Sequence, residues 1–210
     1  REESDGMSSI AVVGTGYVGL TTGSCLAHLG HQVTCIDNNP AKIEMIESGV
    51  MPISEDRLAE IVAEGRGAGR LRFTSDIAGG VTGAEFVLLC VPTPQAADGS
   101  ADLSFIEAAA RQISPHLAPN TVIINKSTVP IGTGDWVADI VKGAQPKPVD
   151  FAVVSCPEFL REGSAIGDFM SPHRTVIGSM DKDAANKVAH LHLPLRAPIV
   201  ITDLRTAEMI

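Results

Sequence analysis

A glycine-rich segment near the N-terminus constrains the fold of this chain most strongly. The motif Gly-Thr-Gly-Tyr-Val-Gly begins at Gly14, directly after the apolar run 10–13, and a helical pattern follows it to residue 29. In such a strand–turn–helix unit, Gly14 permits the tight turn, Gly16 lets a pyrophosphate approach the backbone, and Gly19 lets the helix pack on the sheet. The free amides at the start of the helix favour an anion. The segment therefore predicts a dinucleotide site.

An aspartate extends this signature. Asp37 ends the next apolar run, 33–36, and Gly30 stops the helix between the two runs. A carboxylate at this position accepts hydrogen bonds from the ribose hydroxyls and repels a 2′-phosphate. The sequence therefore favours NAD over NADP as the cofactor, and a glycine-rich turn in another kind of α/β protein is the alternative.

Short apolar strands alternate with helical stretches along the rest of the chain, which is typical of a parallel sheet with helices on both faces. The expected fold class is α/β, a Rossmann-like, doubly wound and mainly parallel sheet. The basic segment 65–70 is expected to be a surface loop. Strands are expected at 10–13, 33–36, 71–73, 86–91, 121–125, 151–155, 175–177 and 199–201, and helices at 16–29, 40–47, 54–64, 103–114, 133–141 and 182–190.

Composition and charge exclude several classes of partner. The chain is 44% hydrophobic and 20% charged, with a net charge of −9, which argues against binding to nucleic acid or to an anionic membrane. No apolar stretch reaches the roughly 20 residues that span a bilayer, and no signal peptide is recognised. We expect a cytoplasmic protein, with a disordered tail or cloning remnant at residues 1–8.

The cysteines, Cys25, Cys35, Cys90 and Cys156, lie far apart in the sequence, so no metal site is expected. The first three fall in apolar patterns and are expected to be small buried hydrophobes. Cys156 follows a predicted strand, where catalytic groups often stand. Because no histidine is near it in sequence, packing is the expected role and a nucleophile is the alternative.

Polar segments follow three predicted strands, at 92–94, 126–133 and 156–163, and lead to the same sheet edge as the glycine loop. The alternative for Ser127 and Thr128 is helix capping. Glu158 and Glu162 are spaced to share one helical turn, either as a solvated face or as a close pair of raised pKa suited to a general base. The side chains suited to acid–base and hydride chemistry are Thr93, Lys126, Ser127, Thr128, Glu158, Arg161 and Glu162.

Together these motifs resemble the UDP-glucose/GDP-mannose dehydrogenase family from residue 10 to residue 210. In that family, an NAD-dependent enzyme oxidises the C6 alcohol of a nucleotide sugar to a carboxylate in two hydride transfers, through a cysteine thiohemiacetal and a thioester. The resemblance implies a nucleotide-sugar substrate and, for the full-length enzyme, a homodimer or larger assembly. The matching segments are 14–20, 91–94, 101–104, 126–132, 157–163, 171–178 and 201–210.

The resemblance also assigns roles to residues. In the family Thr128 orients a water, and Glu158 and Glu162 are acid–base candidates, so these three form the expected catalytic set. The substrate segment implied by the resemblance is Glu158, Phe159, Leu160, Arg161 and Glu162. The cofactor residues that it implies are Gly14, Gly16, Tyr17, Val18, Gly19, Asp37, Lys42, Val91, Pro92, Thr93, Ser127, Thr128 and Glu162. No metal is implied.

None of the cysteines matches the family's nucleophile, which by resemblance lies beyond Ile210 together with a lysine and an asparagine that stabilise the oxyanion. We therefore expect the cofactor-binding half of a longer enzyme, which binds NAD without turning over alone. Residues 9–202 are expected to form the NAD-binding domain, and residues 203–210 to begin a central connecting helix.

Segments 160–165 and 171–174 look most like the family members that convert UDP-glucose to UDP-glucuronate for polysaccharide biosynthesis. GDP-mannose or a UDP-N-acetylhexosamine is the alternative substrate. An alternative of another class is a non-catalytic NAD-binding regulatory module, which the polar groups near the expected nicotinamide end disfavour.

Overall fold

The computed structural model describes residues 6–210, so most of the tail expected at 1–8 lies outside the described residues. Ser8, however, belongs to the folded domain. Its N–H donates to Nδ1 of His31 at 3.2 Å, and its carbonyl accepts the N–H of Gln32 at 3.0 Å. The ordered part of the chain therefore begins before residue 9, where the domain was expected to start.

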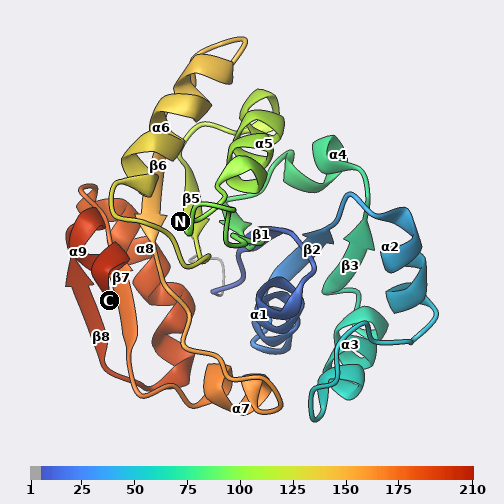
Figure 1. Cartoon of the computed structure of the whole chain (residues 1–210). Coiled ribbons are helices and arrows are strands. Elements are labelled where there is room, and N and C mark those ends of the chain that lie inside the picture. Colours follow the sequence, from blue (N-terminus) through green and yellow to red (C-terminus); the bar gives the residue numbers. More distant parts are fainter. Residues whose placement is uncertain (1–5) are drawn as a thin grey trace, which may run out of the picture.

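A single sheet crosses the middle of the molecule (Figure 1). Its strands are β1 (Ser9–Val13), β2 (Gln32–Ile36), β3 (Leu71–Thr74), β4 (Phe86–Leu89), β5 (Thr121–Asn125), β6 (Phe151–Ser155), β7 (Thr175–Gly178) and β8 (Ile199–Thr202). Their order is β3-β2-β1-β4-β5-β6-β7-β8, and every neighbouring pair is parallel except β6 and β7. The expected doubly wound, mainly parallel α/β fold is confirmed.

Helices cover both faces of the sheet, as Figure 1 shows. The side chains of Ile10 and Val12 join the core under α1, whereas those of Ala11 and Val13 join the core under α5, because alternate strand residues point to opposite faces. The helices are α1 (Tyr17–His28), α2 (Pro40–Glu47), α3 (Leu58–Gly67), α4 (Ile77–Val81), α5 (Ser104–Ile113), α6 (Thr133–Ala144), α7 (Ala165–Met170), α8 (Lys182–His192) and α9 (Leu204–Met209).

Half of the expected basic loop at 65–70 is helical. Helix α3 continues to Gly67, and Gly65 within it packs closely against Leu71. The guanidinium of Arg66 donates to the carbonyl of Glu47 at 2.8 Å, and that of Arg70 donates to the carbonyl of Ala27 at 3.0 Å. These arginines therefore tie neighbouring elements together.

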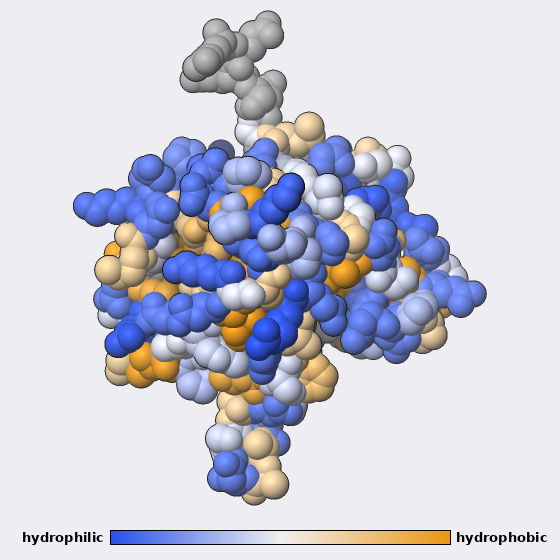
Figure 2. All heavy atoms as spheres, turned by 90° about the horizontal axis from the view of Figure 1, so that it is seen from above, coloured by the Kyte–Doolittle hydropathy of each residue, from blue (hydrophilic) through white to orange (hydrophobic). Residues whose placement is uncertain are grey.

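Figure 2 shows hydrophilic residues over most of the face in view, with hydrophobic residues in separate patches. None of the helices formed by residues 6–210 is long and apolar enough to cross a membrane.

Helix α9 packs over β6 and β7, next to the edge strand β8. The Cβ of Ala207 lies against Gly178, which leaves no space for a side chain there. Both oxygens of Glu208 accept hydrogen bonds at the start of α6, from the N–H groups of Gly132 and Gly134, each at 2.6 Å. Since the first amides of a helix have no partners within the helix, this carboxylate stabilises α6 from a distant part of the chain.

We expect Glu208→Ala to lower the free energy of unfolding by about 2 kcal/mol, because two charge-assisted hydrogen bonds are lost. Urea denaturation measures the change. The matched control is Glu44→Ala, which removes an exposed helical carboxylate and should change stability by less than about 0.5 kcal/mol. Equal stabilities for the two variants would contradict the capping role of Glu208.

Candidate functional site

A cavity of about 630 Å³ opens at the carboxyl ends of β1, β2, β4 and β5. It lies where the strand order reverses about β1, which is where ligands bind in doubly wound sheets. Of the cofactor residues expected from the sequence, those that line it are Gly14, Gly16, Tyr17, Val18, Asp37, Lys42, Val91, Pro92, Thr93, Ser127 and Thr128, and Glu158 also borders it. The structure therefore brings most of the predicted cofactor set into one cavity.

The glycines of the loop have different structural roles. Gly14 has φ +98° and would place a Cβ 2.7 Å from the carbonyl oxygen of Cys90. A Cβ on Gly19 would collide with the carbonyl oxygen of Gly14, so Gly19 lies under the loop and does not line the cavity. A Cβ on Gly16 would meet nothing within 4 Å. The space beside Gly16 is therefore free for a ligand.

Asp37 is bound to the glycine loop. Its Oδ2 accepts hydrogen bonds from the N–H and the hydroxyl of Thr15 at 2.9 and 2.6 Å, and the ammonium of Lys42 lies 3.1 Å from the same oxygen. Its Oδ1 accepts the N–H of Asn39 at 3.1 Å. Burial favours the neutral acid, but these hydrogen bonds outweigh it and hold the pKa of Asp37 below its ordinary value. Asp37 is thus an anion that also positions the loop.

We expect Asp37→Ala to weaken NAD binding by about tenfold or more and to relax the rejection of NADP. The loop loses its anchor at Thr15, and Lys42 becomes free to attract a 2′-phosphate. Asp37→Asn is the matched control, because it keeps an acceptor for Thr15 and removes only the charge. Calorimetric titration of both cofactors measures the effects. An unchanged preference between NAD and NADP in both variants would contradict the assigned role.

Two hydroxyls join the loops after β4 and β5. The hydroxyl of Ser127 donates to the carbonyl of Val91 at 2.7 Å, and that of Thr93 donates to the carbonyl of Thr128 at 2.9 Å. Helix α6 begins only at Thr133, so the alternative that Ser127 or Thr128 caps it is wrong. Both residues face the cavity instead.

The segment after β6 differs from the expectation. Glu158 and Glu162 lie outside any helix, so they do not share a helical turn. Glu158 instead accepts the N–H of Leu160 at 2.5 Å within its own loop, which takes the place of helical hydrogen bonding. Glu162 lines neither of the cavities described here, and its assignment to the cofactor, substrate and catalytic sets stays a prediction.

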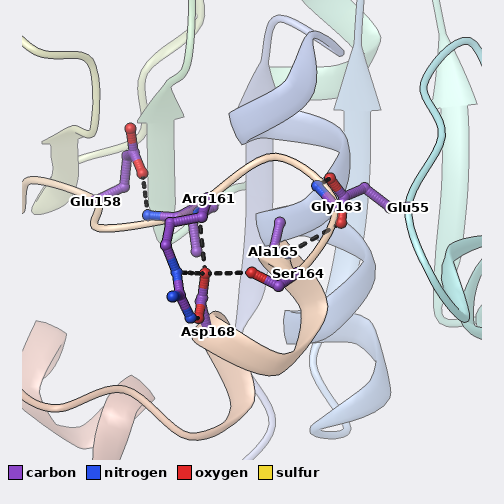
Figure 3. A network of polar contacts seen from close by, with 8 residues as sticks. Glu55, Glu158, Arg161, Gly163, Ser164, Ala165 and Asp168 are labelled. Atoms are coloured by element: carbon purple, nitrogen blue, oxygen red, sulfur yellow. Dashed lines mark hydrogen bonds and ion pairs between the residues drawn. The ribbon is translucent and has the colours of Figure 1, made fainter.

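Arg161 is paired with Asp168, as Figure 3 shows. The guanidinium donates to both carboxylate oxygens, at 2.7 and 3.1 Å, and the N–H of Arg161 also donates to Oδ2 at 3.0 Å. The hydroxyl of Ser164 donates to the same oxygen at 3.0 Å. The hydrogen bonds from Arg161 hold the pKa of Asp168 well below its ordinary value. Arg161 therefore stabilises the conformation of the loop that contains it.

Glu55, from the loop before α3, fixes the same segment from the other side (Figure 3). Its carboxylate accepts the N–H of Gly163 at 2.5 Å and the N–H of Ala165 at 2.9 Å. Glu55 stands more than a hundred residues earlier in the chain, so sequence spacing could not reveal this contact.

A second cavity of about 470 Å³ contains most of the expected substrate segment. Phe159, Leu160 and Arg161 line it, and Glu158 borders both cavities. The predicted cofactor and substrate residues thus lie on two sides of Glu158.

Sequence reasoning missed one wall of the first cavity. Helix α5 contributes Phe105, Ala108, Ala109 and Gln112, whose spacing places them on one helical face. That spacing was visible in the sequence, but nothing in it showed which ligand site the face borders. The other unpredicted lining residues are Val13, Ile36, Asn38, Asn39, Ser75, Ile77 and Cys90.

Within residues 6–210, no group of three or more His, Cys, Asp or Glu side chains is arranged to hold a metal ion. The polar groups that line the first cavity include backbone amides, hydroxyls, carboxylates and the ammonium of Lys42.

The glycine loop at the start of α1, the carboxylate after β2 and the cavity where the strand order reverses define a dinucleotide-binding domain of the Rossmann class. A comparison of sequences identifies it further. Residues 8–196 match the NAD binding domain of the UDP-glucose/GDP-mannose dehydrogenase family. The chain belongs to this family, as the resemblance predicted, and its cofactor is NAD.

Curated relatives agree with this assignment. The chain is 47% identical to UDP-glucose 6-dehydrogenase TuaD of Bacillus subtilis, over 97% of this chain and 44% of the relative. It is 44% identical to a UDP-glucose 6-dehydrogenase of Rhizobium meliloti, over 96% of this chain and 47% of the relative. The chain thus spans about half the length of the curated relatives that it matches.

Solved structures of the same family are also similar to this chain over about half of their length. A UDP-glucose dehydrogenase of Pyrobaculum islandicum superposes with a TM-score of 0.94 at 38% identity, over 100% of this chain and 49% of that one. A GDP-mannose dehydrogenase of Pseudomonas aeruginosa gives 0.91 at 35% identity, over 96% of this chain and 48% of that one.

Proposed function

We propose that this chain is the NAD-binding half of a UDP-glucose 6-dehydrogenase, which oxidises the C6 alcohol of UDP-glucose to the carboxylate of UDP-glucuronate. The observation that carries the proposal is the cavity that joins Gly16 and Asp37 at one end to Thr128 and Glu158 at the other. Bound NAD supplies the hydride acceptor.

Different residues along the cavity bind the cofactor and handle the proton. The amides at the start of α1 bind the pyrophosphate beside Gly16, and Asp37 accepts the ribose hydroxyls. Thr128 orients a water, and Glu158 accepts a proton from the reacting alcohol or water. The position of Glu158 between the two cavities supports this role, since a proton acceptor must stand beside the alcohol at the point where that alcohol meets the cofactor.

Several finer assignments belong to the same proposal. The NAD-binding domain includes Ser8 and extends to residue 202, and α9 begins a connecting helix. The catalytic cysteine comes from the remainder of a cytoplasmic, dimeric enzyme of polysaccharide biosynthesis. UDP-glucose is preferred as substrate because the more similar curated relatives carry that name. A GDP-mannose 6-dehydrogenase of Azotobacter vinelandii, at 39% identity, makes GDP-mannose the second candidate.

The test is to incubate the chain with NAD and UDP-glucose and to follow the absorbance of the reduced cofactor, with GDP-mannose in a parallel assay. We expect NAD binding without sustained reduction, because the nucleophile that completes the oxidation is not in this chain. A full-length relative, the Bacillus subtilis enzyme, is the positive control. Steady reduction of NAD by this chain alone would contradict the proposal that the nucleophile lies outside it.

A further inference from the structure

Three polar side chains are buried together on the face of the sheet that α8 covers. Lys126, Cys156 and His192 are 5%, 1% and 8% exposed. Asn125 and Ser155 are partners at the ends of β5 and β6, so the residues that follow them, Lys126 and Cys156, lie side by side. His192 is the last residue of α8. The histidine that the sequence around Cys156 lacked is therefore supplied by a distant helix.

Lys126 has an unusual partner. Its ammonium is 3.7 Å from the sulfur of Cys156, which is its only hydrogen-bond partner among the described residues, and no carboxylate of residues 6–210 is within ion-pair distance. A buried ammonium without an anion is strongly unfavourable. A thiolate at Cys156 supplies the missing negative charge.

His192 adds to this environment. Its Nδ1 donates to the carbonyl of Val188 at 2.8 Å, which leaves Nε2 for other contacts. Burial raises the pKa of the Cys156 thiol, but the ammonium of Lys126 and the side chain of His192 outweigh burial and lower it to about 6. Cys90 is the neighbouring cysteine, and burial raises its pKa to about 12.

The second cavity gives access to this cluster. Lys126, Cys156 and His192 line its wall, so the cavity extends to this cluster, although Cys156 itself is almost fully buried. The other titratable or charged groups around the cavity are Glu158, Arg161, Asp168, His173 and Arg174. Two of these are already paired, since Arg161 binds Asp168.

We propose that Cys156 is a thiolate that hydrogen peroxide oxidises to a sulfenate, held in place by Lys126 and His192. The sulfur attacks one peroxide oxygen, the S–O bond forms and the O–O bond breaks. The sulfur is oxidised and the peroxide is reduced to hydroxide, which takes the proton of the sulfenic acid and leaves as water. The modified residue stands two positions before Glu158 and alters the wall of the second cavity.

The chain contains its own controls for this proposal. Cys25 and Cys90 have pKa values raised by burial to about 12, the pKa of Cys35 is raised as well, and none of the three lines the second cavity. The test is to treat the purified chain with hydrogen peroxide and dimedone, which traps sulfenates, and to locate the adducts by peptide mass spectrometry. We expect Cys156 to be labelled at least about tenfold faster than the other cysteines.

The pH dependence and a variant complete the test. The labelling rate of Cys156 should rise with pH around a midpoint of about 6. Near neutral pH, Lys126→Met should lower the rate by at least about tenfold, whereas Lys142→Met, which removes an exposed lysine, should not. If Lys126→Met does not fold, the thiolate absorbance of the unmutated chain minus that of Cys156→Ser should show the same midpoint. Labelling of Cys156 no faster than the others, or a midpoint near the ordinary thiol pKa of about 8.5, would overturn the proposal.

Discussion

Gly16→Ala should abolish NAD binding and leave the fold intact. Gly16 has extended backbone angles, φ −71° and ψ −168°, which alanine adopts readily, and its added methyl group would meet no protein atom within 4 Å. That methyl group would occupy the space through which a pyrophosphate approaches the amides of α1. We expect at least a roughly hundredfold loss of affinity, measured by calorimetric titration.

Gly143→Ala is the matched control. Gly143 lies in α6, away from both cavities, and its added methyl group also meets nothing within 4 Å. This variant should bind NAD as tightly as the unmutated chain. If Gly16→Ala also bound NAD normally, the pyrophosphate would lie elsewhere.

Gly19→Ala should damage the fold itself. The new Cβ would collide with the carbonyl oxygen of Gly14, which is rigid backbone, and would lie 3.0 Å from the Cβ of Cys90. Either the glycine loop or β4 must move, and both belong to the centre of the sheet. We expect the free energy of unfolding to fall by about 3 kcal/mol or more in urea denaturation.

Gly143→Ala is the control here as well, and its effect on the free energy of unfolding should have the opposite sign. Gly143→Ala should raise stability slightly, by less than about 0.5 kcal/mol, because a helix favours alanine over glycine but Gly143 lies in the last turn of α6. A Gly19→Ala variant as stable as the unmutated chain would show that α1 does not need a glycine at its contact with the loop. Comparison with Gly16→Ala separates the glycine that packs from the glycine that faces the ligand.

The sequence predicted best the elements with a clear apolar run or a clear cap. The observed bounds of β5, β6 and α2 are the expected ones. Helix α2 begins at Pro40, and the side chain of the preceding Asn39 caps it by accepting the N–H groups of Ala41 and Lys42. The shorter helices α4 and α7 went unnoticed, because five or six residues hold too little periodicity. The reversed direction of β7 depends on pairing with β6, which no local pattern encodes.

The same distinction between local patterns and distant contacts holds for the residues of the site. Residues next to the glycine motif or at strand ends could be predicted, because topology brings strand ends to one edge. Glu55 and His192 could not, since each reaches its partners from a distant part of the chain. The pairing of Arg161 with Asp168 depends on how the loop folds, and the expected helical spacing of the glutamates misjudged that loop.

The central claim is that this cavity binds NAD with its adenosine ribose against Asp37. Parallel calorimetric titrations of the unmutated chain with NAD and with NADP test it most directly. We expect NAD to bind and NADP to bind at least about tenfold more weakly, because a 2′-phosphate would face the half-buried carboxylate of Asp37. Equal affinities for the two cofactors, or no binding of NAD, would contradict it.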